Sequence, residues 1–321
     1  MVKKKHHYLT RYYLEGFCDA NEMVWTYLKA SSKKPFPQKP ENTALENKLY
    51  NLNIQNSPEL ISKIEDYFSH KIETPAADPF KKLIARSLPD SDAKNKLSLF
   101  FGSLFVRTPS YLAHLDKIFS TDLHHFVKTL ASNKDHYHES WKNFDPSASD
   151  TEIEEYRQLV LKENIIIGVN RNFLLENMVL MIKIIASFLY AMKWCLIETN
   201  KDWHFITSDS LANIVNADIK KQGFYQPGFG MHNSEVTIPI SKYLTLVMIN
   251  NSNLKEDIFS INNQKKSFKF NLKDIIKNLN KITVLRANQF IFSSTNSEKI
   301  KRLLINCSNI KDLNKGVFTS C

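Results

Sequence analysis

The apolar segment over residues 178–197 constrains the fold more than any other part of the chain. It is long and apolar enough to be compared with a membrane-spanning helix, yet it contains Lys183 and Lys193. A charged side chain at the centre of a bilayer helix costs about 2.5–3.5 kcal/mol on the insertion scale. The two lysines therefore favour a buried core helix, which we predict over residues 172–198, and argue against a membrane partner.

The composition is that of an ordinary globular protein. Of the 321 residues, 43% are hydrophobic and 24% are charged, which is enough to build a sizeable core. The four cysteines include no CxxC pair, so a disulfide framework or a zinc knuckle is not expected and a reducing compartment fits better. No apolar run follows the basic N-terminus, so a signal peptide is not expected and the cytoplasm is the predicted location.

The charge balance points towards an anionic partner. Lys and Arg number 43 against 33 Asp and Glu, which gives a net charge of +10. Such an excess favours nucleic acid or a nucleotide as the partner. The same lysine-rich surface would also serve plain solubility, so charge alone leaves the two explanations open.

Hydrophobic spacing predicts a helix-rich chain up to about residue 200. The predicted helices cover residues 9–17, 58–68, 97–105, 111–130, 152–164 and 172–198. A short strand is predicted at 23–28, and the prolines of 31–40 predict a loop. Residues 132–150 are polar and rich in turn-forming residues, which predicts a boundary or an exposed insertion.

Short β-type runs dominate the last third of the chain. They cover residues 204–207, 235–239, 244–249, 267–272 and 289–293, with helices predicted at 211–221 and 297–305. The predicted fold class is therefore α+β, in one domain over residues 1–321. A mainly helical part, 1–200, packs with a small sheet in the mixed part, 201–321.

The first candidate site is the N-terminal cluster His6, His7, Tyr8 and Arg11. Histidine exchanges protons near neutral pH, arginine binds phosphate in a bidentate manner, and tyrosine can donate a proton. His7 and Arg11 share a face if a helix begins early. The set matches what cleavage of a phosphate ester without a metal requires. The alternative is a solvated basic tail.

The second candidate is Asp209, which ends a β-type run. Loops at strand ends often carry functional residues because a rigid scaffold aims them. A carboxylate there can orient a histidine, bind a metal or bind a ribose hydroxyl. The alternative is that Ser208 or Asp209 caps a helix over residues 211–221.

Two further residues are candidates for substrate contacts. Arg107 ends an apolar helix before Thr108-Pro109 and could hold an anion or cap the last carbonyls. Glu65 could pair with Arg107 or act as an acid, or it could simply be exposed. No metal or other cofactor is expected, because the paired histidines at 124–125 and at 136 and 138 lack a third ligand at a known spacing.

The order of these motifs resembles an uncharacterised bacterial family, domain of unknown function four-two-three-eight. Its members open with His-His-Tyr-(Val/Leu)-Pro-Arg-Phe-Tyr-Leu, and a later strand runs into Thr-Ser-Asp. Residues 6–14 and 205–209 match these motifs, while Ile64-Glu65, Arg107-Thr108-Pro109 and residues 238–241 are weaker matches. Thr10 replaces the usual proline, and Ser210-Leu211 replaces the usual Asn-Pro. Some members are associated with defence against phage, so the resemblance implies such a role without supplying a reaction.

These observations give one leading hypothesis and two alternatives. The leading hypothesis is a defence-associated hydrolase acting on a phosphodiester or nucleotide, such as a metal-independent ribonuclease that binds RNA. The predicted catalytic residues are His6, His7, Tyr8, Arg11 and Asp209. In this hypothesis His6 or His7 acts as acid and base, and Asp209 orients a histidine or the ribose. Arg11 and Arg107 hold the phosphate, and Ser208 and Glu65 also contact the substrate. The first alternative is a non-catalytic sensor of a nucleotide or phage component, and the second is a purely structural role for the N-terminal cluster.

Overall fold

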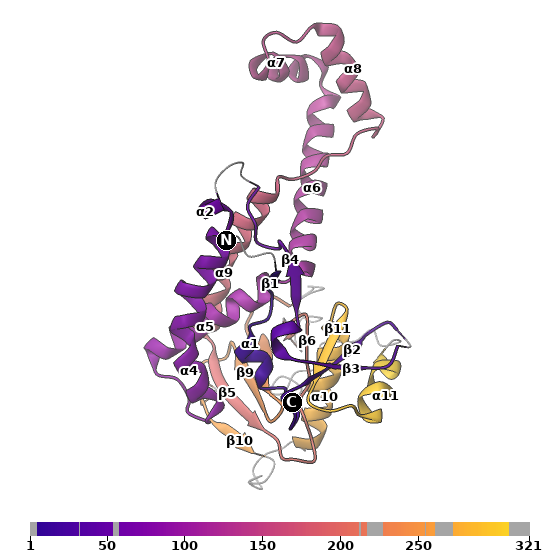
Figure 1. Ribbon diagram of the computed structural model, residues 1–321. Coiled ribbons are helices and arrows are strands. Elements are labelled where there is room, and N and C mark those ends of the chain that lie inside the picture. The colour runs from indigo at the N-terminus through magenta and orange to yellow at the C-terminus, as the bar shows by residue number, and fades with distance from the viewer. Residues whose placement is uncertain are drawn as a thin grey trace. The chain divides into compact units, whose positions relative to one another are not determined.

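The computed structural model describes residues 5–31, 33–53, 58–211, 213–216, 227–253, 255–260 and 272–307 (Figure 1). The chain divides into two compact units. One contains Met1–Ser110 with Met178–Cys321, and the other is the inserted Tyr111–Asn177. The larger unit contains both ends of the chain, because strands from both ends share one sheet.

Helices build most of the first half of the larger unit. They are α1 (Arg11–Glu15), α2 (Pro58–Ile61), α3 (Lys63–Tyr67), the π-helical turn η2 (Phe68–Glu73), α4 (Thr74–Ile84) and α5 (Ser91–Val106), with a 3-10 turn at Pro40–Asn42. Asp90 starts α5 by accepting a hydrogen bond from the amide of Ala93 at 2.9 Å. The predicted helix at 97–105 is thus confirmed, and it starts earlier than its apolar part because the cap is polar.

Two larger sheets occupy the rest of this unit. Among the described residues, a five-stranded sheet has the order β10-β5-β9-β8-β7, and a four-stranded sheet has the order β3-β2-β11-β6. A two-stranded ribbon pairs β1 (Lys5–His7) with β4 (Leu45–Asn47). The other strands are β2 (Val24–Leu28), β3 (Phe36–Gln38), β5 (Lys193–Glu198), β6 (Thr207–Ser208), β7 (Asn213–Val215), β8 (Glu235–Ser241), β9 (Leu244–Ile249), β10 (Ile258–Ser260) and β11 (Phe290–Ser293). The α+β class is confirmed.

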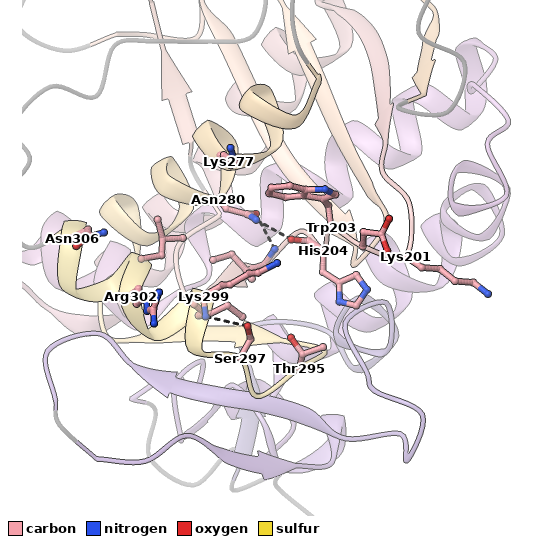
Figure 2. A pocket seen from close by; sticks show the side chains of 14 residues that line it. Lys201, Trp203, His204, Lys277, Asn280, Thr295, Ser297, Lys299, Arg302 and Asn306 are labelled. Carbon is pink, nitrogen blue, oxygen red and sulfur yellow. Dashed lines mark hydrogen bonds between the residues drawn. The ribbon is translucent and has the colours of Figure 1, made fainter.

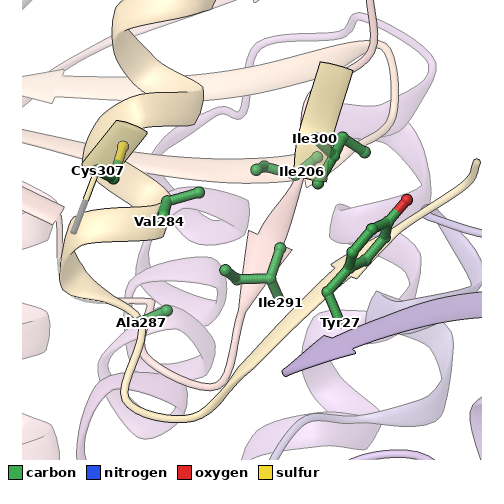
Figure 3. Close-up of a cluster of buried hydrophobic side chains, with 7 residues drawn as sticks. All are labelled: Tyr27, Ile206, Val284, Ala287, Ile291, Ile300 and Cys307. Carbon is green, nitrogen blue, oxygen red and sulfur yellow. The ribbon is translucent and has the colours of Figure 1, made fainter. Parts of the chain in front are cut away.

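The helices α10 (Leu272–Arg286) and α11 (Glu298–Cys307) pack against the four-stranded sheet (Figure 1). Figure 3 shows the cluster that joins them: Tyr27, Ile206, Val284, Ala287, Ile291, Ile300 and Cys307. Tyr27 comes from β2, whereas Ile291 comes from β11. Because the N-terminal strands β3 and β2 share one sheet with β11 and β6 from the last third, folding must bring the two ends of the chain together.

The long apolar segment is shorter as a helix than predicted. Helix α9 spans Arg171–Ala191, and residues 193–198 form β5, paired with β9. Hydropathy alone does not separate a buried strand from a buried helix, and the β-formers around Trp194 decide for the strand. The helix is long and apolar enough to cross a membrane, and 39% of its most apolar window is buried. It is therefore less buried than we expected.

Residues 132–150, predicted as a boundary or an exposed insertion, lie in the inserted unit. They are more regular than their turn-forming residues suggested, since 134–144 form helix α7, which begins where Asn133 accepts a hydrogen bond from the amide of His136. Two other local predictions were wrong. Residues 213–215 lie in β7 and not in a helix, because their backbone pairs with β8. The proline-rich loop contains β3, where Pro37 is tolerated at the edge of its sheet. The strand predicted at 267–272 lies almost entirely outside the described residues, and residue 272 begins α10.

The inserted unit is helical. It contains most of α6 (Pro109–Ser132), α7 (Lys134–Phe144), α8 (Asp150–Leu161) and the start of α9. Ser149 and Glu152 form a capping box at the start of α8. Ala131, Tyr137, Ile153 and Val160 form its buried core. The predicted helix at 152–164 is thus confirmed in position.

Candidate functional site

Arg107 is a buried clamp on the N-terminal segment. Its side chain leaves the end of α5 and lies over the ring of Phe68, with the guanidinium carbon 5.1 Å from the ring centre. Nη1 forms an ion pair with Glu73 at 2.6 Å. Nη2 donates to the carbonyl of His7 at 2.8 Å, and Nε donates to the carbonyl of Tyr8 at 3.1 Å. Burial disfavours the charge, but the neighbouring Glu73 carboxylate keeps the pKa of Arg107 above its ordinary value.

His6 belongs to the same buried arrangement. Its ring stacks on Tyr50 with centroids 5.3 Å apart, and its Nδ1 accepts a hydrogen bond from the amide of Tyr50 at 3.0 Å. The hydroxyl of Tyr50 donates to the carbonyl of Arg107 at 2.6 Å. The contacts of His6 and Arg107 therefore hold backbone in place, which matches the structural alternative for this cluster.

His7 keeps the chemistry of a proton acceptor. Its Nδ1 lies 3.2 Å from the carbonyl oxygen of Thr43. Because a carbonyl only accepts, Nδ1 carries the proton and the neutral ring has its acceptor at Nε2. Burial lowers the pKa of His7, assisted by Arg107, while Glu65 and Glu73 act in the opposite direction. The ring is therefore neutral at pH 7 and can accept a proton.

Tyr8 and Arg11 are placed differently from each other. The Tyr8 side chain is buried, and burial together with the nearby negative charges of Asp209 and Glu46 raises the pKa of its hydroxyl. Tyr8 thus lies within electrostatic reach of Asp209. Arg11 is 65% exposed and pairs with Glu15 at 3.0 Å on the surface of α1. The described contacts of Arg11 do not bring it to Arg107 or Asp209.

Asp209 holds a turn near the other end of the chain. Its carboxylate accepts three backbone hydrogen bonds, from Asn288 at 2.8 Å, Gln289 at 2.7 Å and Phe290 at 2.9 Å. Burial raises the pKa of Asp209, although the three amides favour its charged form. Ser208 donates to the carbonyl of Ser210 at 2.7 Å. The predicted capping of a helix at 211–221 is wrong, because the carboxylate instead joins the ends of α10 and β11.

Tyr13 connects the two family-like motifs directly. Its hydroxyl donates to the carbonyl of Pro239 at 2.6 Å, so the hydroxyl of Thr207, 2.7 Å away, donates to Tyr13. Gly16 lies so close to β8 that an added Cβ would meet the Ile240 oxygen at 2.8 Å. The amide of Lys242 donates to the carbonyl of Gly16 at 2.8 Å. Sequence reasoning missed Tyr13 and Gly16, although Tyr13 belongs to the N-terminal match and Gly16 follows it closely.

A second set of residues, which sequence reasoning also missed, forms a basic pocket around Trp203 (Figure 2). We call it the Trp203 pocket. It has a volume of about 660 Å³, and its walls come from the segment before β6, from α10 and from α11. Its charged and aromatic lining residues are Lys201, Asp202, Trp203, His204, Lys277, Lys299 and Arg302. Asp202 is the one acidic residue among the lining residues that the structure describes.

Trp203 positions two of these cations. The ammonium nitrogens of Lys277 and Lys299 lie 5.3 and 5.5 Å from its ring centre. The ring itself packs against a buried cluster that contains Phe205 and Leu279. Figure 2 shows the two lysines near Trp203, from two different helices. The sequence signal was available as Lys299 and Arg302, which share one face of a predicted helix.

Polar groups below Trp203 are already hydrogen-bonded within the fold. Asn280 donates to the carbonyl of His204 at 2.8 Å and accepts from the amide of Ile206 at 3.1 Å. His204 Nδ1 lies 3.0 Å from the hydroxyl of Ser294. Burial, together with Lys242, lowers the pKa of His204. The pocket therefore combines cations next to Trp203 with a floor whose polar groups already have hydrogen-bond partners within the fold.

Acidification is expected to destabilise the protein through two half-buried histidines, His7 and His204. The pKa values of His7 and His204 are lowered from 6.5. As the pH falls through about 6.5, the unfolded chain takes up protons that the folded state still rejects, so the free energy of unfolding falls. We expect the melting temperature to drop between about pH 7 and pH 5. His7→Asn, which can still donate to Thr43, should show a shallower drop in melting temperature. An unchanged dependence on pH would contradict a neutral, half-buried His7.

A family model described as protein of unknown function, DUF4238, matches residues 5–297. Searches of curated proteins and of solved structures found no match. Among the described residues, no group of three or more His, Cys, Asp or Glu side chains could hold a metal ion. The description of the family names no activity.

Proposed function

Because the chain belongs to the DUF4238 family, whose description names no activity, we propose a function from its pocket: it binds a nucleotide or nucleic acid. The single observation that carries this proposal is the position of Lys277 and Lys299 over Trp203, with Lys201 and Arg302 in the same pocket. Ammonium and guanidinium groups bind phosphate, and an indole ring stacks on nucleobases.

The free energies of the two contacts favour replacement of a lysine on the indole ring by a nucleobase. An exposed cation–π contact contributes about 0.5–1 kcal/mol, whereas stacking of one base on an aromatic ring contributes about 1–3 kcal/mol. A base can therefore displace Lys277 or Lys299 from the ring, and the displaced ammonium group stays close enough to bind the phosphate. The net charge of +10 adds long-range attraction for such ligands.

Charge reversal at Lys299 should weaken binding. With a fluorescently labelled adenosine triphosphate and a short labelled RNA as probes, we expect Lys299→Glu and Trp203→Ala to raise the dissociation constant about tenfold or more, because each removes phosphate or base contacts. Fluorescence anisotropy at fixed salt measures this. Lys71→Glu, an exposed lysine on η2 outside the pocket, makes the same change in net charge and serves as the control.

If Lys71→Glu and Lys299→Glu weaken binding of the probes equally, only net charge matters. That result would contradict binding in the Trp203 pocket. Wild-type protein that binds neither probe would contradict the proposal itself. Circular dichroism and melting curves of each variant separate loss of binding from loss of folding.

A second candidate function is phosphodiester cleavage, favoured by the neutral His7 ring with its acceptor at Nε2. The anti-phage role implied by the family resemblance belongs to this proposal. Gel electrophoresis of the RNA probe after incubation with the protein, with a chelator present, distinguishes cleavage from binding alone. Turnover that disappears in folded His7→Asn supports an enzyme, whereas binding without turnover in every variant supports a sensor.

A further inference from the structure

Helix α11 separates the Trp203 pocket from a second basic pocket. The second pocket has a volume of about 510 Å³ and lies between α11 and the segment that follows β2. Its charged lining residues are Lys29, Lys33, Lys34 and Lys301, and none of its described lining residues is acidic. We call it the Lys34 pocket. Two basic hollows thus flank one helix.

The spacing of residues along α11 explains why both of its sides are basic. Lys299, Arg302 and Asn306 line the Trp203 pocket, at intervals of three and four residues. Lys301, Leu304 and Ile305 line the Lys34 pocket, again at helical intervals. Residues three or four apart lie on one face of a helix. Each pocket therefore receives its own face of α11, and the helix forms a ridge between them.

The lysines of the Lys34 pocket have different roles. Lys29 donates to the carbonyls of Leu285 and Ala287, at 2.9 and 2.6 Å, so it belongs to the floor. Lys33 and Lys34 are exposed at the rim. Lys301 forms an ion pair with Glu298 at 2.5 Å. The rim therefore carries positive charge directed at solvent, next to the apolar wall of Leu304 and Ile305.

Resting on the proposed function, we infer that the ligand is a single strand of nucleic acid that crosses α11 and occupies both pockets. A helix with its side chains is about 10–12 Å wide. A stacked strand advances about 3.4 Å per phosphate, so three or four nucleotides span the ridge. Single-strand sites combine cations along the backbone with aromatic or apolar faces for bases, and the two pockets supply both.

A mononucleotide does not account for the Lys34 pocket, since it fills only one hollow. The inference therefore predicts that affinity rises with strand length until both pockets are occupied. It also predicts that Lys33 and Lys34 matter for a strand and not for a mononucleotide. RNA and DNA share the required phosphate and base chemistry, and paired probes of the same sequence distinguish them.

The test compares the double variant Lys33→Glu/Lys34→Glu with wild type by fluorescence anisotropy. The probes are labelled adenosine triphosphate and single-stranded RNA and DNA of about ten nucleotides, within the range of known single-strand sites. We expect the variant to bind the strands about tenfold or more weakly and to bind the triphosphate unchanged. The plot of log affinity against log salt concentration should become shallower by about 1.4 or more in the variant, since two phosphate contacts are lost.

Matched controls separate the outcomes. Lys71→Glu/Lys81→Glu makes the same charge change on exposed lysines of η2 and α4, and equal weakening by this pair overturns the inference. If affinity does not depend on the length of the strand, the inference is overturned, whereas the proposed binding in the Trp203 pocket is not. Failure of the wild type to bind any probe removes the proposed function as well. If the protein sediments with phosphatidylserine vesicles and RNA does not release it from them, the two pockets bind a membrane surface. That result would overturn the inference of a nucleic-acid strand.

Discussion

Replacing Arg107 with leucine is expected to lower the free energy of unfolding by about 3–5 kcal/mol, the usual loss when one partner of a buried ion pair is removed. The substitution leaves the Glu73 carboxylate without its 2.6 Å partner. It also removes the donors to the carbonyls of His7 and Tyr8. Chemical denaturation of the purified variant measures the change. Such a loss is a large fraction of the free energy of unfolding of an ordinary domain, which is about 5–15 kcal/mol.

Arg11→Leu is the matched control, because Arg11 belongs to the same N-terminal motif but is 65% exposed. An exposed ion pair contributes about 0.2–1 kcal/mol, so this variant should melt close to the wild type. Arg107→Leu/Glu73→Leu should regain part of the stability lost in the single variant, since no buried charge then lacks its partner. A stable Arg107→Leu protein that binds its ligand poorly would instead make Arg107 an anion-binding residue.

Asp209→Asn is expected to destabilise the fold by about 2–3 kcal/mol, because hydrogen bonds to a buried charge are strong and an unsatisfied buried donor is costly. The asparagine has nearly the same shape, yet its amide group is a donor. One side of the new side chain must therefore face the backbone amides of Asn288, Gln289 or Phe290 without accepting from them. Thermal melts measure the effect, and the turn between α10 and β11 should lose protection from hydrogen exchange.

Asp78→Asn provides the control for Asp209→Asn, because its carboxylate is 74% exposed on α4. We expect it to change stability by less than about 0.5 kcal/mol, as most surface substitutions do. If Asp209→Asn instead melts like the wild type and abolishes an activity of the protein, the carboxylate acts on a substrate. The structural assignment of Asp209 would then be wrong.

These two variants together test what the family-like motifs do. Arg107 and Asp209 both direct their charges at backbone groups, and Tyr13 joins Thr207 to Pro239. The described contacts of Arg107, Asp209 and Tyr13 are therefore structural hydrogen bonds within the fold. The sequence had predicted catalytic or substrate-binding roles for Arg107 and Asp209. His7 differs from the rest, because its ring is only partly buried and has its acceptor at Nε2. It is the residue of the original cluster on which a catalytic proposal still depends.

Local sequence patterns determined much of the secondary structure. The apolar spacing of residues 97–105 and 111–130 predicted α5 and α6, and the β-formers of 244–249 predicted β9 with its actual bounds. Such patterns are reliable because side-chain periodicity reflects which face of an element is buried. The excess of lysine and arginine also predicted an anionic partner, although not the place where it would bind.

Tertiary structure decided the rest, because the deciding contacts join residues far apart in the chain. From the sequence, Arg107 could hold an anion or donate to backbone carbonyls. In the folded chain residues 7 and 8 lie beside it, and its donors bind their carbonyls. The helix predicted to 198 ends at Ala191 because β9 offers a ladder to residues 193–198. The Trp203 pocket exists only where α10 and α11 bring Lys277 and Lys299 to one indole ring. Periodicity records burial within one segment, whereas a pocket depends on how separate segments meet.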